Sequence, residues 1–516
     1  MVLPPKPIPP SGEDKLPQKS PLLEAMEVDT YAGKLHVEWD PGATVTPMGQ
    51  LPFFIQFLKI GGRFDPWVDE CPLHYRSNNA PEKVDVLGSL FLSIISGHNR
   101  YAHITNLMCE KVNPGLLGMN KVVSDDSARR ALKKIDEDNG AQWMQEHLYS
   151  CYSPLLATPW ILDVDVTVKP LYGHQEDAVR GYNPAKPGRP SHTYHTYMIG
   201  NLRLVLDVDV QAGNQSHSND SLPGLMSLLE RFPEDCRPEF VRGDIAWGTD
   251  NAMTQLENAN LCYLFKVKKS KNVKELICKH HCLGEWLYLN KEWEAKEDVL
   301  QLQGWQKSRR VVVVRRKISS EDVIAIESQK KGQQQIAFVD GPEDMRAYEY
   351  SVLITNLDSE VTSIFHHYRD RADCENNFDE IKNQWGWGGY TTQNMKSNRI
   401  MARMIALVYN WWNLYVRLAI PDKHHEAITS RPLLLSSVGR LTEHGRQKKM
   451  TITSSHGDLT KLKKAYARLV TFFSELKAAA PQLSSTECWR KILMKAMEKF
   501  AVKAKPNAPP ELSAPA

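Results

Sequence analysis

Four side chains between positions 368 and 382 have the residue types and spacing to act together on a phosphate group. They lie three, four and seven residues apart in a segment that is predicted to be helical: Tyr368, Arg371, Glu375 and Lys382. At 3.6 residues per turn, their directions fall within roughly 60° of one another. One helix face therefore offers a carboxylate, a phenol and two cations, a combination suited to chemistry at a phosphodiester.

Metal-dependent phosphodiester chemistry needs further carboxylates from other elements. Two divalent ions about 3.5–4 Å apart can activate the attacking oxygen and stabilise the leaving oxygen, and Mg²⁺ prefers carboxylate oxygens and water. Asp165 lies in the alternating segment ILDVDVTVKP, on the face away from its apolar row, and Asp244 directly follows the strand-like PEFVRG. With Glu375, they form a candidate ligand set for two Mg²⁺ or Mn²⁺ ions. Asp163, on the same strand face as Asp165, is the alternative first ligand.

The helical segment resembles a known signature. Its spacing, Tyr368-x2-Arg371-x3-Glu375-x6-Lys382, matches the Y-(2)-R-(3)-E-(6)-K pattern of bacterial insertion-sequence transposases of the DDE type. Asp379 shares the face of Glu375, but only Glu375 fits that pattern.

Two further segments carry the same resemblance. Asp165-Val-Thr is similar to the first motif of that group, although Val166 stands where Gly or Ser is commoner. Arg242-Gly-Asp-Ile-Ala-Trp247 is similar to the second motif, and the segment 181–192 (GYNP…GRPSH) resembles a loop of one branch. The resemblance covers about residues 85–420.

Membership of that group would imply a fold, an activity and partners. It implies an RNase H-like core in which Asp165, Asp244 and Glu375 are catalytic and hold the metal ions. It also implies that the Tyr, Arg and Lys of the signature bind phosphates near the transposon end, roles that fall here on Tyr368, Arg371 and Lys382. The expected activity is cleavage at terminal inverted repeats and strand transfer into target DNA, by a homodimer assembled on double-stranded DNA.

The periodicity of the surrounding segments independently predicts an α/β fold. ILDVDVTVKP, HTYHTYMIG and LRLVLDVDV are three strands, followed by alternating helices and strands through LCYLFKVK near residue 268. This order is expected of a mixed sheet flanked by helices. Residues 267–355 interrupt the alternation and are predicted to be a mostly β insertion, after which helices resume.

The N-terminal part is predicted to be helical and to include a DNA-binding unit. A turn at Asn113-Pro-Gly separates an apolar segment from the capped run SARRALKKIDED, which carries Arg129, Arg130 and Lys133. Helix, turn and basic helix suit a DNA-reading unit. A solvated basic helix packed on a core is the alternative.

Seven segments are predicted. They are a disordered tail (1–22), a helical DNA-binding region (23–155), the first part of the core (156–266), the β-rich insertion (267–355), the second part of the core with the signature helix (356–425), a C-terminal helical region (426–502) and a second disordered tail (503–516).

Composition narrows the class of protein. The chain has 516 residues, 42% of them hydrophobic, and a formal net charge of only +3, so contacts to DNA must come from local basic clusters. Nine cysteines without a repeating pattern indicate a reducing compartment. No signal peptide or bilayer-length apolar run is visible. A cytoplasmic, nucleoid-associated bacterial protein without a membrane partner is expected.

Other signals have two interpretations each. Trp385 and Trp387 either pack in the core or stack on a base. The segment Cys278-Lys-His-His-Cys282 lacks a second ligand pair at zinc spacing, which favours surface side chains.

Two rival functions also stay open: an inactive, transposase-derived DNA-binding protein, and an RNase H-like nuclease that acts on branched DNA.

Overall fold

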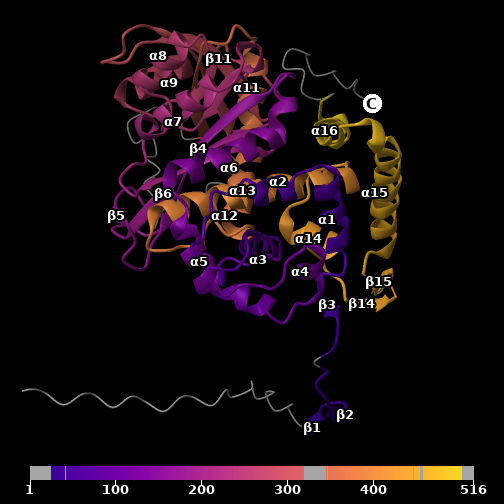
Figure 1. The fold of residues 1–516 in the computed structure, drawn as a ribbon. Coiled ribbons are helices and arrows are strands. Elements are labelled where there is room, and N and C mark those ends of the chain that lie inside the picture. The colour runs from indigo at the N-terminus through magenta and orange to yellow at the C-terminus, as the bar shows by residue number, and fades with distance from the viewer. Residues whose placement is uncertain are drawn as a thin grey trace, which may run out of the picture.

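The computed structural model describes residues 25–40, 42–318, 345, 347–445, 447–453 and 457–501. The segments 1–22 and 503–516, predicted to be disordered, lie outside the described residues. The described part is a mixed α/β structure with one large sheet and many helices (Figure 1). No helix in it is long and apolar enough to cross a membrane.

Ten described strands form the large sheet. In chain order they are β4 (Ile161–Pro170), β5 (Val179–Arg180), β6 (Pro190–Ile199), β7 (Leu204–Ala212), β8 (Phe240–Gly243), β9 (Tyr263–Lys266), β10 (Leu287–Tyr288), β11 (Trp293–Leu300), β12 (Arg309–Lys317) and β13 (Tyr348–Thr355). Their order in space is β10-β11-β12-β13-β9-β8-β4-β6-β5, with β7 also paired to β6. The β4–β8 and β8–β9 pairs are parallel, and the other pairs are antiparallel.

The strands predicted from alternation are confirmed. ILDVDVTVKP is β4, and the next two predicted strands are β6 and β7, joined at Gly200. The described part of the predicted insertion is mostly β and includes the helix α9 (Lys271–Leu283). It does not form a separate sheet, because β13 pairs with β9 and continues the sheet of the core.

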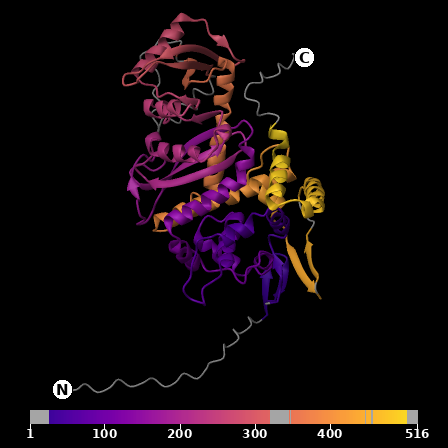
Figure 2. The same ribbon diagram turned by 45° about the horizontal axis from the view of Figure 1, so that its top comes forward.

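Helix α13 (Met395–Ala419) is the central helix of the molecule. It is buried along almost its whole length and contacts β7 on one side and the N-terminal helices on the other (Figure 2). Asn410 fixes it to the sheet, because its side-chain amide accepts from Val205 N at 2.8 Å and donates to Val205 O at 2.7 Å. The Arg403–Asp207 ion pair, 2.7 Å long and buried, makes a second link to β7.

The remaining helices surround this centre. The N-terminal helices are α1 (Leu51–Ile60), α2 (Phe64–Asp69), α3 (Lys83–Ile95), the 3-10 helix η1 (Tyr101–Leu107), α4 (Val112–Leu116), α5 (Asp125–Lys134) and α6 (Glu137–Tyr152). The later helices are α7 (Ser218–Glu230), α8 (Asp250–Asn258), α11 (Val361–Arg369), α12 (Arg371–Gln384), α14 (Ala427–Leu434), α15 (Leu459–Ala479) and α16 (Ser485–Ala501).

Two regions predicted to be helical also contain strands. β1 (Met26–Thr30) and β2 (Gly33–Val37) form a hairpin that projects from the body (Figure 1). β3 (Val45–Thr46) pairs with β14 (Gly439–His444), which pairs with β15 (Gln447–Ile452). The helical prediction was wrong for these segments because the strands are short and mostly exposed, so they lack the apolar alternation that marks a buried strand.

Candidate active site

Asp165 lies within β4, and Asp244 directly follows the end of the neighbouring parallel strand β8. The register of β4 and β8 pairs Val164 with Gly243, and each aspartate is the next residue along its chain. Neighbouring strands are about 4.8 Å apart, and residues at matching positions of parallel strands face the same side of the sheet. Both side chains are half-buried. The two carboxylates that the sequence predicts as ligands are therefore brought together.

Arg371, at the start of α12, faces this pair of carboxylates. Its guanidinium donates to Asp165 Oδ1 at 3.2 Å. Burial lowers the pKa of Arg371, but nearby acidic groups, Asp165 first, outweigh burial and raise the pKa above its ordinary value. Asp244 contributes to the same rise, so its charge is also close enough to act on this arginine.

Asp163, the alternative first ligand, belongs to a buried ion pair instead. Its two carboxylate oxygens accept from Arg242 Nε at 2.5 Å and Nη2 at 2.7 Å. The Asp163 side chain is 1% exposed and that of Arg242 is 2% exposed. Arg242 also donates to the carbonyl oxygen of His367 in α11. This environment favours Asp165 over Asp163 as the first ligand, since a metal ion at Asp163 would have to displace a bidentate arginine in the core.

Gly200 makes the space for this ion pair. A β-carbon at Gly200 would lie 1.9 Å from Asp163 Oδ2. Gly200→Ala is therefore expected to lower the free energy of unfolding by about 1–3 kcal/mol, the usual cost of forcing an extra methyl group into a packed core. Urea denaturation measures this change.

The matched control is Gly115→Ala in α4, where a β-carbon would meet nothing within 4 Å. That variant should be unchanged or slightly more stable, because alanine favours a helix over glycine. Equal changes in the free energy of unfolding for Gly200→Ala and Gly115→Ala would show that the Asp163–Arg242 ion pair can move aside for the extra methyl group at no cost.

The residues around Asp244 explain the rest of the Arg-Gly-Asp-Ile-Ala-Trp segment. A β-carbon at Gly243 would lie 2.8 Å from the Trp247 ring, so glycine lets this buried tryptophan pack against the end of β8. Asp244 Oδ1 accepts from Ala246 N at 2.9 Å, which orients its carboxylate at the start of the turn.

The four residues of the predicted signature do not share one helix. α11 ends at Arg369 and α12 begins at Arg371, with Asp370 as a single turn residue between them. The single-helix prediction was wrong here because helical periodicity alone does not reveal a one-residue break. Tyr368 packs beside the cluster that contains Phe240 and Phe365.

The other three signature residues lie along α12. Arg371 is at its start, Glu375 follows by one helical turn, and Lys382 is in its last turn. The side chain of Glu375 lies outside the described residues. Lys382 lines a cavity together with Thr167 and Lys169 of β4, so both ends of α12 approach β4. Asp379 is exposed and accepts from Asn383 Nδ2 at 2.7 Å.

The basic residues of the predicted DNA-reading helix lie elsewhere, on α5. α5 contacts η1, α3 and α13 rather than β4 or β8. Arg129 forms ion pairs with Asp125 at 2.9 Å and Asp126 at 2.7 Å, and Arg130 approaches Asp126 at 3.6 Å. Lys133 is exposed. Two of the three cations therefore pair with acids of their own helix.

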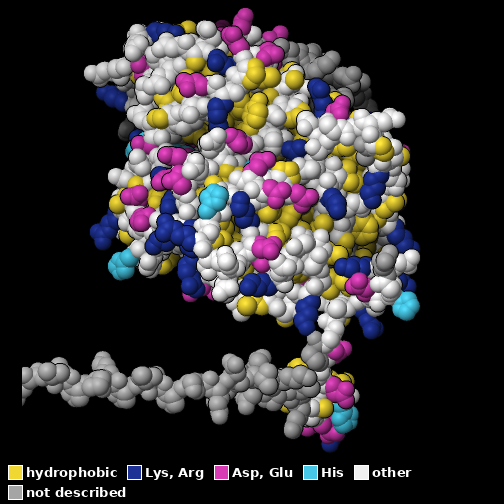
Figure 3. All heavy atoms as spheres, viewed as in Figure 1, with side chains coloured by type: hydrophobic (Ala, Val, Ile, Leu, Met, Phe, Trp, Pro, Cys, Tyr) yellow, Lys and Arg dark blue, Asp and Glu magenta, His cyan; other side chains and the backbone are white. Residues whose placement is uncertain are grey.

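Sequence reasoning gave no role in DNA contact to the basic residues of the loop between β4 and β6. This loop carries Arg180, Lys186 and Arg189, which line a hollow of about 520 Å³. The ring of Tyr172, 66% exposed, lies 4.9 Å from Lys186 Nζ and 4.5 Å from the Arg189 guanidinium carbon. Figure 3 shows Lys and Arg side chains gathered on this side of the molecule, where Figure 1 labels β5 and β6. Three cations within ten residues were the available signal.

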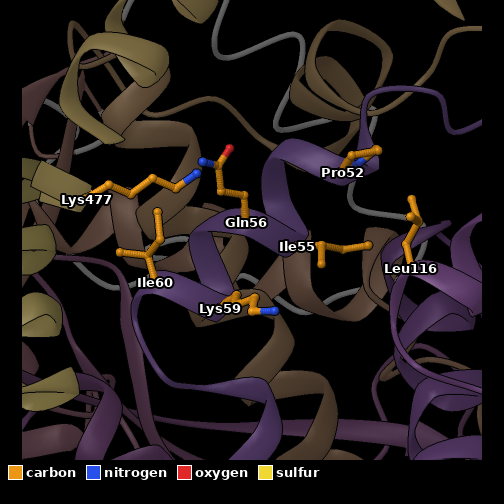
Figure 4. Close-up of a pocket in the computed structure, with 7 residues that line it drawn as sticks. All are labelled: Pro52, Ile55, Gln56, Lys59, Ile60, Leu116 and Lys477. Atoms are coloured by element: carbon orange, nitrogen blue, oxygen red, sulfur yellow. The ribbon is translucent and has the colours of Figure 1, made fainter. Parts of the chain in front are cut away.

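An apolar hollow of about 460 Å³ is not part of this site. Pro52, Ile55 and Ile60 of α1 line it together with Leu116 of α4 and Lys477 of α15 (Figure 4). Among the described residues that line it, Lys59 and Lys477 are the charged ones and none is a carboxylate, so the hollow lacks the anionic oxygen ligands that a divalent cation such as Mg²⁺ prefers. Figure 1 places α1 and α15 on the opposite side of the molecule from β5 and β6.

The two tryptophans after α12 are core residues. Trp385 is fully buried and donates to Glu380 Oε1 at 3.1 Å, while Trp387 donates to the carbonyl oxygen of Ala402 at 3.0 Å.

The two histidines of the segment Cys278–Cys282 lie on α9 and face different partners. His280 contacts Asp298 at 2.7 Å, and His281 contacts the Tyr350 hydroxyl at 2.8 Å.

Asp165 and Asp244 fit a divalent cation of the magnesium type. Carboxylate oxygens are the protein ligands that such an ion prefers, and it usually takes only one or two carboxylates and keeps its waters. Both side chains are half-buried, and they lie where β8 ends beside β4. The donor set is entirely oxygen, which does not favour a softer metal.

One family model agrees with this chemistry. The sequence model of a family described as "Transposase DDE domain group 1" matches residues 76–472, which is more than half of the chain. No curated protein matches the sequence. Among solved structures, the chain has a TM-score of 0.38 to a piggyBac transposase synaptic complex with hairpin DNA, at 12% identity, over 91% of this chain and 87% of that one. A TM-score this low does not establish a shared fold.

Proposed function

Because this chain belongs to the family of transposase DDE domains, group 1, we propose that it binds the terminal inverted repeats of an insertion sequence and cuts and rejoins the DNA there. Asp165, Asp244 and Glu375 are the proposed catalytic residues and metal ligands. The proposed core is RNase H-like. Three strands followed by two strands separated by helices, in one mixed sheet, support that assignment.

The observation that carries the proposal is the pair of carboxylates that follow the paired residues Val164 of β4 and Gly243 of β8. α12 runs past the same strand, and its first residue, Arg371, donates to Asp165. Glu375 follows Arg371 by one helical turn, and residues four apart on a helix share a face. This position supports Glu375 as the third carboxylate.

Each group in the site has a distinct role in the proposed reaction. DDE transposases generally use divalent metal ions, and two Mg²⁺ or Mn²⁺ ions would supply an activated oxygen nucleophile and stabilise the leaving oxygen. Asp165 and Asp244 would hold these ions where β8 ends beside β4. Arg371 is placed to turn from Asp165 to a phosphate oxygen when DNA enters, since its guanidinium can form two parallel hydrogen bonds to phosphate. Asp163 and Arg242 keep β4 and β8 in register beneath the site.

The loop between β4 and β6 is the proposed contact to the DNA that flanks the site. Arg180, Lys186 and Arg189 are exposed, and Tyr172 offers a ring beside them. Tyr368, on α11, and the cations Arg129, Arg130 and Lys133 of α5 stay candidates for DNA contacts. Two copies of the chain, one for each end of the element, are the proposed assembly.

Removing the three loop cations is expected to change the salt dependence of DNA binding. Each neutralised phosphate contributes about 0.9 to the slope of log affinity against log salt for duplex DNA. Arg180→Gln, Lys186→Gln and Arg189→Gln together should therefore lower the magnitude of this slope by about two to three. Fluorescence anisotropy with duplex DNA at several salt concentrations measures it.

Lys495→Gln with Lys499→Gln on α16 is the control, because these exposed lysines pair with Glu498 and Asp422. The control should leave the slope unchanged. A loop variant with an unchanged slope would remove the loop from the DNA contact surface.

The experiment that tests the proposed function is a cleavage assay on a duplex that carries the inverted repeats flanking the gene. Nicking at the repeat boundary with Mg²⁺ or Mn²⁺, and none in EDTA, is the expected result. Repeat-specific binding without nicking would favour an inactive DNA-binding derivative. Faster cutting of branched junctions than of repeat ends would favour a nuclease.

A further inference from the structure

Lys169 is a buried lysine without a carboxylate partner in the described part of the chain. It lies on β4, four residues beyond Asp165, and is 4% exposed. Its ammonium donates to the Tyr194 hydroxyl at 3.0 Å and to the carbonyl oxygen of Gly389. Both acceptors are neutral, so neither supplies the opposite charge that a buried ammonium usually has.

The same lysine lines a cavity of about 260 Å³. Thr167 and Lys169 come from β4, Tyr194 from β6, and Lys382 and Asn383 from the last turn of α12. The cavity walls thus carry two cations, the phenols of Tyr172 and Tyr194, a hydroxyl and an amide, and none of the lining residues that the structure describes is acidic. All of these groups can donate a hydrogen bond, which is the requirement of a site for an anion.

The position of this cavity relative to the carboxylates is fixed by β4. Side chains two residues apart on a strand face the same side, so Asp165, Thr167 and Lys169 share one face. At about 3.3 Å per residue, Lys169 lies roughly 13 Å along the strand from Asp165. A DNA strand cut at Asp165 and Asp244 would reach the cavity a few nucleotides from the cut.

We propose that Lys169 completes a phosphate site in this cavity. Beside Lys382, for which the signature already implies a phosphate contact, Lys169 binds a phosphate group of the DNA strand a few nucleotides from the cleaved bond. That the bound phosphate belongs to DNA rests on the proposed function. That the cavity binds an anion does not. Burial lowers the pKa of Lys169 to about 7, so near neutral pH the empty cavity holds only part of its lysine as ammonium. A bound phosphate supplies the opposite charge and stabilises the charged form.

The rival interpretation is structural: Lys169 ties β4 to the turn after α12 through Gly389. Lys169→Gln distinguishes the structural interpretation from the anion site. Glutamine removes the charge that an anion needs, but it keeps an N–H donor for the neutral acceptors. Lys495→Gln is the matched control, an exposed lysine of α16 that pairs with Glu498 at 2.7 Å.

The first arm measures how much inorganic phosphate raises the melting temperature of the full chain, at constant ionic strength set with chloride. Each protein is compared with its own phosphate-free value, so a general loss of stability does not affect the result. Phosphate should stabilise the wild type and Lys495→Gln, and it should not stabilise Lys169→Gln. Equal shifts in all three proteins, or no shift in the wild type, would overturn the anion site.

The second arm uses duplex DNA of random sequence in EDTA, which distinguishes a DNA phosphate from free phosphate. Lys169→Gln should bind this DNA about tenfold more weakly, the usual size of one charge-assisted hydrogen bond. Unchanged DNA affinity, with phosphate binding lost, would show that the cavity serves a small anion and would overturn the DNA assignment.

A third measurement uses only the wild type, in case the variant does not fold. Acetylation of Lys169 by a small reagent, read by mass spectrometry, should be slowed by DNA, whereas acetylation of Lys495 should not. Equal rates with and without DNA would contradict the proposal. A wild type that binds phosphate at Lys169 but never nicks DNA would remove the proposed function and leave this site in place.

Discussion

Asp244→Asn is expected to lower metal-dependent nicking by a factor on the order of 10³ or more, while DNA binding in EDTA stays within a few fold of the wild type. The physical reason is that metal binding needs an ionised carboxylate. Loss of several kcal/mol of transition-state stabilisation lowers the rate by several factors of ten. Initial nicking rates with Mg²⁺ and DNA affinities in EDTA measure the two effects separately.

Asparagine is the informative substitution at this position. Its Oδ1 can still accept from Ala246 N, so the turn after β8 keeps its hydrogen bond. The matched control is Asp379→Asn on α12, an exposed acid whose Oδ1 accepts from the side-chain amide of Asn383. That variant should nick at the wild-type rate. Nicking that survives in Asp244→Asn, or DNA binding that disappears, would show that Asp244 is not a metal ligand.

Asp163→Asn should have the opposite pattern and mainly reduce stability. The substitution leaves the charge of Arg242 buried without its carboxylate, and breaking a buried ion pair in this way costs about 3–5 kcal/mol. Asp244→Asn should lose less stability, because the side chain of Asp244 is only half-buried. Urea denaturation of the two variants measures the difference in their free energies of unfolding.

A double variant tests the cause of this loss. Asp163→Asn combined with Arg242→Met removes the buried charge entirely and should recover part of the stability, since apolar replacements of buried ion pairs are often well tolerated. An Asp163→Asn protein as stable as Asp244→Asn would mean that the ion pair contributes little. Loss of nicking in a stable Asp163→Asn protein would reopen Asp163 as a ligand.

The two predictions treat neighbouring aspartates of one strand in opposite ways, and the sequence alone could not do so. Alternation along ILDVDVTVKP puts Asp163 and Asp165 on the same face. Their environments differ because Arg242, from β8, and Gly200, from the turn before β7, enclose only Asp163. Both partners are distant in sequence, and no local pattern announces them.

The amino-acid sequence by itself determined the local elements and the chemistry on them. Alternation located β4, β6 and β7, because a side chain on a strand has a period of two whatever surrounds it. Residue spacing brought Arg371 and Glu375 onto one helix, and residue type identified Asp165 and Asp244 as candidate ligands.

Tertiary structure alone decided which of these residues meet, and in what surroundings. Pairing of β13 with β9 joined the insertion to the core sheet, and Asp370 divided the signature between two helices. Burial of Lys169 beside a cavity also had no signal in its segment. The physical reason is that local conformation depends on neighbours in sequence, whereas burial, register and charge partners depend on segments that meet only in the folded chain.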